Sequence, residues 1–192
     1  MTGSALLAIV ALVAAVNPSR VAEVGGRLPP PGEAAGGRSQ VATAAAGAAL
    51  AALVFVLLGA GADGLLDAAD VSAPTLLVGA GLVLIGAGAK DLFIGPPAAE
   101  PAMTGWGAAI VPVAIPATAR PQVGLLALST GATHGMGAVA VGSLLIVLCV
   151  AGLVALGSTG VRARVRHWFG VLAAVVTVGA GVAFAVDGVF SV

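Results

Sequence analysis

Two short segments place polar and basic residues beside a proline within an apolar run. The first is Asn17-Pro18-Ser19-Arg20, and the second is 118–122, which reads Thr-Ala-Arg-Pro-Gln. Proline lacks a backbone N–H and clashes with the preceding turn, so a helix breaks or kinks at each segment. In an apolar environment the carbonyl groups that are freed need other partners. The short polar side chains of Asn17, Ser19 and Thr118 can supply them.

Arg120 is the residue in these segments best suited to ligand chemistry. An arginine at the centre of a membrane helix costs about 2.5–3.5 kcal/mol, so it should face the bundle interior or water. Its guanidinium is then a counter-charge for an anionic group. The alternatives are an arginine that reaches an interface and one that pairs with a buried acid, of which Asp187 is the acid nearest a span. Arg20 either mirrors Arg120 or, as we prefer for Arg20 alone, marks the end of the first span.

We therefore predict that the two breaks face each other and line a substrate site near the membrane midplane. Paired helix breaks in corresponding positions of two halves usually mark such a site. The alternative is two ordinary kinks that neighbouring helices satisfy. The predicted binding residues are Asn17, Pro18, Ser19, Arg20, Thr118, Arg120, Pro121 and Gln122.

Composition excludes several classes of protein. Of the 192 residues, 59% are hydrophobic and only 8% are charged, whereas a soluble domain has about 25% charged residues. This excludes a soluble enzyme and a nucleic-acid-binding protein, and eight basic residues balanced by eight acidic ones form no basic surface. The remaining class is a polytopic membrane protein whose surroundings are the lipid bilayer.

No catalytic, metal or cofactor site is expected. Cys149 is the single cysteine, so an intrachain disulfide or a redox pair is not possible. Neither His134 nor His167 has a second ligand at metal-binding spacing. No nucleophile is accompanied by a base.

The elements that must position these residues are six predicted spans. A bilayer core of about 30 Å requires roughly 20 apolar residues per helix. Four runs approach this length, at 41–62, 75–89 with 92–94, 135–157 and 168–186. Two shorter runs, 4–16 and 106–119, end at a proline and span only if the chain continues beyond it. We therefore predict an all-α membrane protein whose first and fourth helices are broken at proline.

The distribution of charge predicts the orientation of these spans. Basic residues are enriched in cytoplasmic loops. Seven of the eight basic residues fall on one side, and Arg120 is the exception; the seven are Arg20, Arg27, Arg38, Lys90, Arg162, Arg164 and Arg166. Both termini are therefore predicted to lie outside the cytoplasm. Abundant Ala, Gly and Val, with Arg used over Lys, are typical of a GC-rich bacterial genome, and we therefore expect the chain in a bacterial inner membrane.

Six spans divide into two sets of three, which must have opposite orientations. We predict a first three-helix repeat at 1–95, a cytoplasmic linker at 96–105 and a second, inverted three-helix repeat at 106–192. The stretches 78–81 and 178–181 share the sequence Val-Gly-Ala-Gly. The glycines at 79, 81, 86, 88, 170, 179 and 181 are expected to let helices pack closely.

The order of these features resembles the MarC-type proteins of the LysE superfamily of membrane transporters. That family has Asn-Pro near the end of its first span, as at Asn17-Pro18, and a glycine-rich third span, as at 78–84. Its second half opens with a pattern close to P-[LV]-A-x-P-x-x-x-G-P-G. Residues 112–122 read PVAIPATARPQ, with the three prolines and the alanine at matching spacing.

This resemblance implies six spans in two inverted halves and a transport function, with small neutral amino acids as substrates of some relatives. Arg120 and Gln122 stand where the family has glycines. Glycine lets a ligand approach the backbone, whereas arginine fills that space and adds a fixed charge. An anionic substrate, such as a carboxylate, a phosphate or a lipid head group, fits this local chemistry better.

The leading interpretation is a transporter or exporter of a small anionic or amino-acid-like solute. One alternative is a lipid or lipid-phosphate translocation protein, and another is a non-transporting accessory subunit of a cell-envelope membrane complex. Stable isolation alone or as a homodimer favours a transporter. Obligatory co-purification with a membrane partner favours a subunit.

Overall fold

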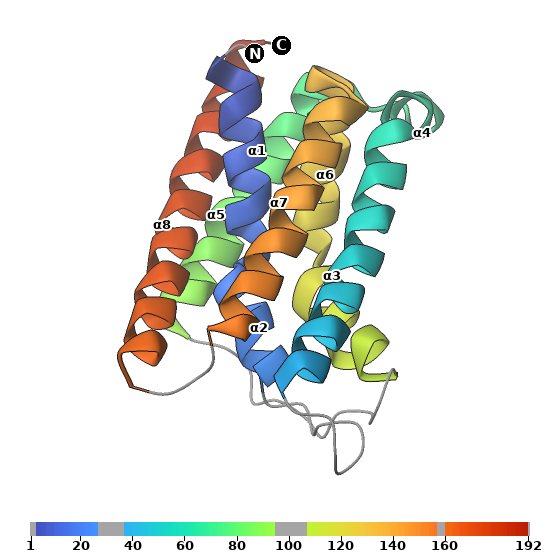
Figure 1. Ribbon diagram of the computed structural model, residues 1–192. Coiled ribbons are helices and arrows are strands. Elements are labelled where there is room, and N and C mark those ends of the chain that lie inside the picture. The colour runs from blue at the N-terminus through green and yellow to red at the C-terminus, as the bar shows by residue number, and fades with distance from the viewer. Residues whose placement is uncertain (1–2, 27–36, 95–106, 157–159, 192) are drawn as a thin grey trace.

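The computed structural model describes residues 3–26, 37–94, 107–156 and 160–191, and every regular element within these ranges is a helix. The helices run side by side in a bundle, and both chain ends lie at the same end of it (Figure 1). In chain order they are α1 (Gly3–Val16), α2 (Pro18–Gly26), α3 (Gly37–Ala60), α4 (Ala62–Ala69), α5 (Ala73–Phe93), the π-helical η1 (Ala109–Thr118), α6 (Pro121–His134), α7 (Met136–Ala155) and α8 (Gly160–Phe190).

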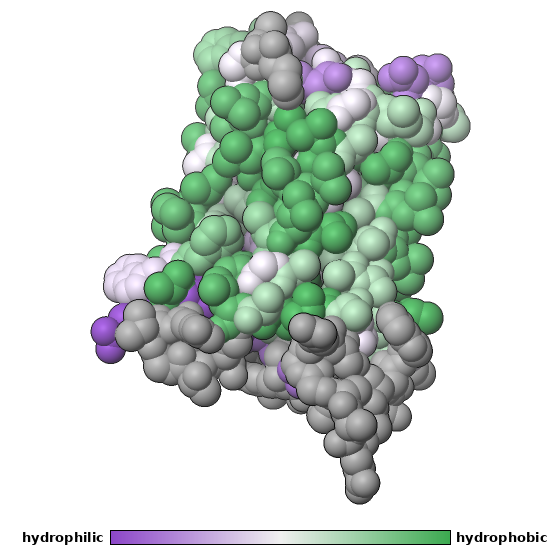
Figure 2. Space-filling model, in the orientation of Figure 1, coloured by the Kyte–Doolittle hydropathy of each residue, from purple (hydrophilic) through white to green (hydrophobic). Residues whose placement is uncertain are grey.

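Five segments of the described chain are long and apolar enough to cross a membrane. They are Gly3–Val24, Gln40–Ala60, Ala73–Phe93, Met136–Ala155 and Arg164–Phe190. The surface between the two ends of the bundle is mostly hydrophobic on the face that Figure 2 shows. Leu57, Leu82 and Leu172 each expose more than half of their surface. A soluble monomer rarely exposes apolar patches of this extent, so the fold is compatible with a multi-pass membrane protein.

The predicted fourth span is interrupted more strongly than the other five. η1 ends at Thr118 and α6 begins at Pro121, and neither piece alone is long enough to cross a bilayer. The first span is broken more gently, because α2 follows α1 after the single residue Asn17.

The two ends of the bundle differ in charge. We call the end at which α5 ends and α8 begins the basic end, because Lys90 and Arg164 lie there. The opposite, acidic end carries Asp187 and α4 with its aspartates Asp63 and Asp67. The segment between α3 and α5 forms the short helix α4. Arg27, Trp106 and the predicted linker 96–105 lie outside the described residues.

Two helices begin earlier than the apolar runs indicate. α3 starts at Gly37 instead of 41, and α8 starts at Gly160 instead of 168. The first turns of α8 contain three arginines, which hydropathy assigns to a loop. Hydropathy marks the part of a helix that suits lipid, and a helix can continue beyond that part.

α5 and α8 pack along a seam of small residues. A Cβ added at Gly81 would lie 2.6 Å from the carbonyl oxygen of Gly181, and one added at Gly181 would lie 2.7 Å from that of Gly81. Only glycine permits this approach of two backbones. By contrast, Gly79, Gly86 and Gly179 have nothing within 4 Å of an added Cβ. The prediction of glycine packing therefore holds for one helix face and not for the other.

The seam is reciprocal along its length. A Cβ at Gly88 would lie 3.0 Å from the carbonyl oxygen of Ala174, and a Cβ at Gly188 would lie 2.9 Å from that of Pro74. The residue numbers of the two contacts differ by 100 (88 and 188, 74 and 174). Equivalent positions of the two helices thus make equivalent contacts.

Two further glycines each pack against an apolar side chain of a broken span. Gly47 of α3 packs against Val113 of η1, where an added Cβ would lie 2.6 Å from Val113 Cγ1. Gly142 of α7 packs against Leu12 of α1, where an added Cβ would lie 2.7 Å from Leu12 Cδ2. α3 and α7 therefore each use a glycine to contact one of the two broken spans.

Candidate functional site

The first break occurs at Asn17, where the backbone turns into the left-handed region with φ of 53°. Asparagine tolerates this conformation better than most residues. Pro18 then starts α2 at a position where its missing N–H costs little. The Asn17 N–H donates to the carbonyl of Ala14 at 2.9 Å. In a regular helix the Ala14 carbonyl would accept from the N–H of residue 18, which proline lacks. The bond from Asn17 replaces it.

Two side chains fix the first break to α8. Asn17 Nδ2 donates to the Gly170 carbonyl at 3.3 Å, and Ser19 Oγ donates to the Arg166 carbonyl at 2.8 Å. Asn17 and Ser19 are both buried. The polar partners predicted at this break are therefore present, but they serve the backbone of another helix. Asn17 Oδ1 is buried with no hydrogen-bond partner.

The second break is set by the closely spaced prolines of η1. Val111 and Ile115 have extended backbone angles, and each directly precedes a proline, as the clash with the proline ring requires. Thr118, which is fully buried, donates its hydroxyl to the Val113 carbonyl at 2.8 Å. Thr118 therefore bonds to a main-chain carbonyl beside the second break. Arg120 follows in an extended conformation as the N-cap of α6.

Two arginines, one from each break, converge on the carboxylate of Asp91 near the end of α5. Arg20 Nη1 lies 2.5 Å from Asp91 Oδ1, and Arg120 Nη1 lies 3.2 Å from Asp91 Oδ2. Arg20 Nη2 also donates to the main-chain carbonyl of Asp91 at 2.6 Å. The side chains of Arg20, Asp91 and Arg120 are 13%, 12% and 17% exposed. We call these three residues the arginine cluster.

The arginine cluster corrects two expectations. The acid that pairs with Arg120 is Asp91, and not Asp187, which lies at the acidic end. Arg20 does more than mark the end of a span, since it shares its carboxylate with Arg120. Two formal positive charges share the one carboxylate of Asp91, and Glu23 of α2 is a further acid whose charge acts on Arg20.

The arginine cluster lies nearer the basic end than the midplane site that we predicted. Asp91 is only two residues from the end of α5. The helix breaks bring Arg20 and Arg120 together. The other predicted residues differ in burial, since Pro18 is buried, Gln122 is half-buried and Pro121 is exposed.

A cavity of about 600 Å³ lies at the acidic end, opposite the arginine cluster. Residues of α1, α5, α6 and α8 line it, and its polar members include Thr133, His134 and Asp187. Thr133 Oγ1 lies 2.7 Å from His134 Nδ1. The bundle thus holds a partly polar cavity at one end and a closed ion cluster toward the other.

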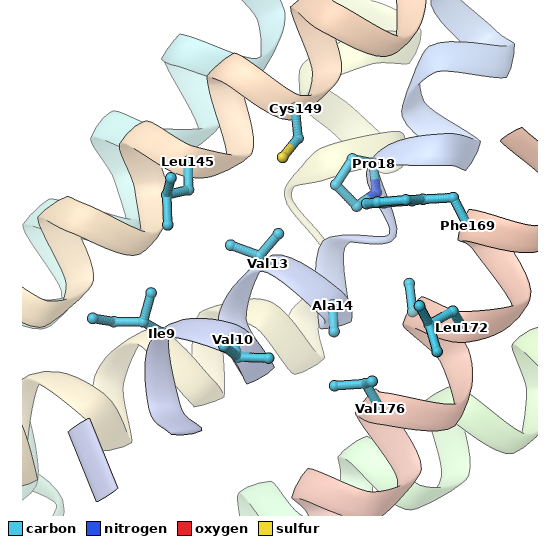
Figure 3. Close-up of a pocket in the computed structure, with 11 residues that line it drawn as sticks. Ile9, Val10, Val13, Ala14, Pro18, Leu145, Cys149, Phe169, Leu172 and Val176 are labelled. Atoms are coloured by element: carbon cyan, nitrogen blue, oxygen red, sulfur yellow. The ribbon is translucent and has the colours of Figure 1, made fainter. Parts of the chain in front are cut away.

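A second, apolar groove of about 250 Å³ lies between α1, α7 and α8 (Figure 3). Its lining includes Val13, Cys149, Phe169 and the ring of Pro18. Because Pro18 follows Asn17 directly, the groove lies beside the first break. Its walls are almost entirely apolar, so it suits a hydrocarbon chain and not a solute.

The comparisons with known proteins leave the family unassigned. No family model, curated protein or solved structure matches the chain. The resemblance to MarC-type proteins therefore stays a prediction. Within the described residues, no group of three or more His, Cys, Asp or Glu side chains is arranged to hold a metal ion.

Proposed function

We propose that this chain is a small multi-pass membrane transporter of an anionic solute, which it binds through Arg20 and Arg120. The observation that carries the proposal is their convergence on one carboxylate from the two helix breaks. Arginine presents a planar fork of donors that matches carboxylate and phosphate oxygens. Two such forks that meet at one acid are already arranged for an anion of similar shape.

Reciprocal contacts between the halves support an inverted repeat of three helices each. The Gly88 and Gly188 contacts are equivalent under an exchange of halves, as are the Gly47 and Gly142 contacts. In this proposal η1 and α6 together cross the membrane once, as the fourth of six crossings in chain order. Inverted repeats allow alternating access, in which one half rocks against the other around a fixed site.

The two ends of the bundle fit one state of such a cycle. The 600 Å³ cavity lies at the acidic end, while the arginine cluster ties α2, α5 and α6 together toward the basic end. We propose that the cavity belongs to the access route and that the cluster closes the opposite route. With basic residues toward the cytoplasm, the cavity and both termini face outward across a bacterial inner membrane.

Anion flux into liposomes containing the purified protein tests this function. The probes are radiolabelled phosphate and succinate, measured with the unmodified chain and with Arg20→Gln and Arg120→Gln. Arg164→Gln is the matched control, because Arg164 is an exposed arginine of the same end. We expect flux of at least one anion that falls about tenfold or more in the two site variants, since each loses a charged hydrogen-bond donor, and is kept in the control. Flux no greater than in protein-free liposomes, or equal in all variants, would refute the proposal.

The apolar groove favours one second candidate, the translocation of a lipid with an anionic head group. In that case a hydrocarbon chain would occupy the groove beside Pro18. Fluorescent phosphatidic acid in the same liposomes distinguishes the two functions. A lipid transporter moves the labelled lipid between leaflets, whereas a solute transporter leaves it in place.

A further inference from the structure

We propose that Asp91 is an internal competitor of the substrate, and that the site consequently selects an oxyanion group with about two negative charges, such as phosphate, over a monocarboxylate. This inference rests on the proposed anion site and adds its substrate class and its gate. Substrate binding displaces the Asp91 carboxylate from Arg120 and so releases the N-terminus of α6 from α5.

The two arginines hold Asp91 unequally. Arg20 makes two contacts, one to the carboxylate at 2.5 Å and one to the main-chain carbonyl at 2.6 Å. Arg120 makes one contact, to the other carboxylate oxygen at 3.2 Å. Arg20 therefore stays on α5 whatever the Asp91 side chain does. Arg120 is the arginine that an incoming anion can capture.

Charge and tethering decide which anions can capture it. A monocarboxylate offers Arg120 the same chemistry as Asp91, but Asp91 is tethered at an effective concentration in the millimolar range or above. A free monocarboxylate at lower concentration loses this competition. A phosphate group carries a charge of about −1.5 to −2 and three acceptor oxygens, so it attracts the Arg120 guanidinium more strongly than a monocarboxylate does and can take it from Asp91.

Displacement of Asp91 also couples binding to movement. Arg120 is the N-cap of α6, and it follows Ala119, whose backbone angles are not helical. The bond from Arg120 to Asp91 spans from this break to α5. When a phosphate group takes the place of the carboxylate, that side-chain link between α5 and the second break is lost. The closed end of the bundle is then free to open.

The test is a titration of thermal stability in detergent with sodium phosphate and sodium acetate at constant ionic strength. Phosphate should stabilise the unmodified chain, and acetate should not. Asp91→Asn keeps the size of the side chain but removes the competing charge. We expect its half-saturating phosphate concentration to fall about tenfold or more, and acetate to become stabilising, because charged hydrogen bonds are worth this much or more. An unchanged phosphate affinity, or unchanged discrimination against acetate, overturns the inference.

Arg120→Gln provides a second variant, because it leaves the Arg20–Asp91 pair in place. It should lose the stabilisation by phosphate, whereas Arg164→Gln should keep it. If Arg120→Gln responds to phosphate as the unmodified chain does, the assignment of Arg120 fails. A third series with phosphatidic acid identifies the source of the phosphate group. Stabilisation at far lower concentrations than inorganic phosphate indicates a lipid, and equal concentrations indicate a soluble phosphate.

The binding and flux experiments fail independently. Tighter phosphate binding by Asp91→Asn without flux in liposomes upholds the competitor and refutes transport. Flux that depends on Arg120, with phosphate binding that ignores Asp91, upholds transport and refutes the competitor.

Discussion

The glycine seam between α5 and α8 allows a stability prediction with a matched control two residues away. In Gly81→Ala the new Cβ would lie 2.6 Å from both the Ala185 nitrogen and the Gly181 carbonyl oxygen. Both are backbone atoms, so relief requires the two helices to move apart. Overpacking of this kind costs about 1–3 kcal/mol. At about 2–4 °C per kcal/mol for a chain of this size, a cost of about 2 kcal/mol lowers Tm by about 4–8 °C.

The control is Gly79→Ala, because an added Cβ at Gly79 meets nothing within 4 Å. Alanine is favoured over glycine in a helix by up to about 1 kcal/mol, so this variant should be neutral or more stable. The assay is thermal unfolding of the two purified variants in one detergent, followed by circular dichroism. An equal loss of Tm in both variants would show that the Gly81 contact does not exist.

The double variant adds a sharper test of the same contact. Gly81→Ala and Gly181→Ala each separate the helices, so the second substitution meets less resistance once the first is present. The combined loss should be smaller than the sum of the single losses, by an interaction energy of about 0.5–3 kcal/mol. Full additivity would place the two glycines in separate environments and contradict the seam.

Two further predictions concern the second break and the apolar groove. Thr118→Val should lower the free energy of unfolding by about 1–3 kcal/mol, because it leaves the buried Val113 carbonyl without the Thr118 hydroxyl. The control is Thr177→Val, because the Thr177 hydroxyl bonds to the Ala173 carbonyl within a regular helix. It should cost less in the same unfolding assay, and equal costs would contradict the role of the break. Cys149 lines the groove, so in membrane vesicles a membrane-soluble maleimide should modify its thiol faster than a charged maleimide does. Mass spectrometry measures the two rates. Equal rates would mean that the groove holds water.

The five apolar segments that are long enough to cross a membrane could be predicted from sequence, because long apolar runs have a direct physical cause. The bilayer core requires about 20 apolar residues per helix, and each apolar run in the sequence reflects this requirement in its length. Helix ends were less predictable, as the early start of α8 at Gly160 shows. Charged residues at a helix end do not interrupt backbone hydrogen bonds, so the helix continues past the apolar run.

The arginine cluster could be predicted only in part. Arg120 was identifiable because a charge beside apolar residues is costly. Asp91 was missed because it follows Lys90 at the end of a span, where charged residues are ordinary. Its partners are 71 and 29 residues away in the chain, so only the packed bundle identifies them. The one available signal was that Arg20 and Asp91 both fall at the predicted cytoplasmic end.

The buried glycine faces could not be predicted either. Gly79 and Gly81 lie two residues apart in one motif, yet only Gly81 contacts α8. In a helix that is apolar on every side, hydrophobic periodicity does not distinguish the face toward protein from the face toward lipid.

The α5–α8 seam has the form of an isologous interface within one polypeptide. In a two-fold symmetric dimer, residue i of one subunit meets residue j of the other, and j meets i. Gly88 with Ala174 and Gly188 with Pro74 follow that rule at a constant offset of 100 (188 minus 88, 174 minus 74). In terms of symmetry, α5 and α8 therefore pack as two copies of one helix related by a two-fold axis would.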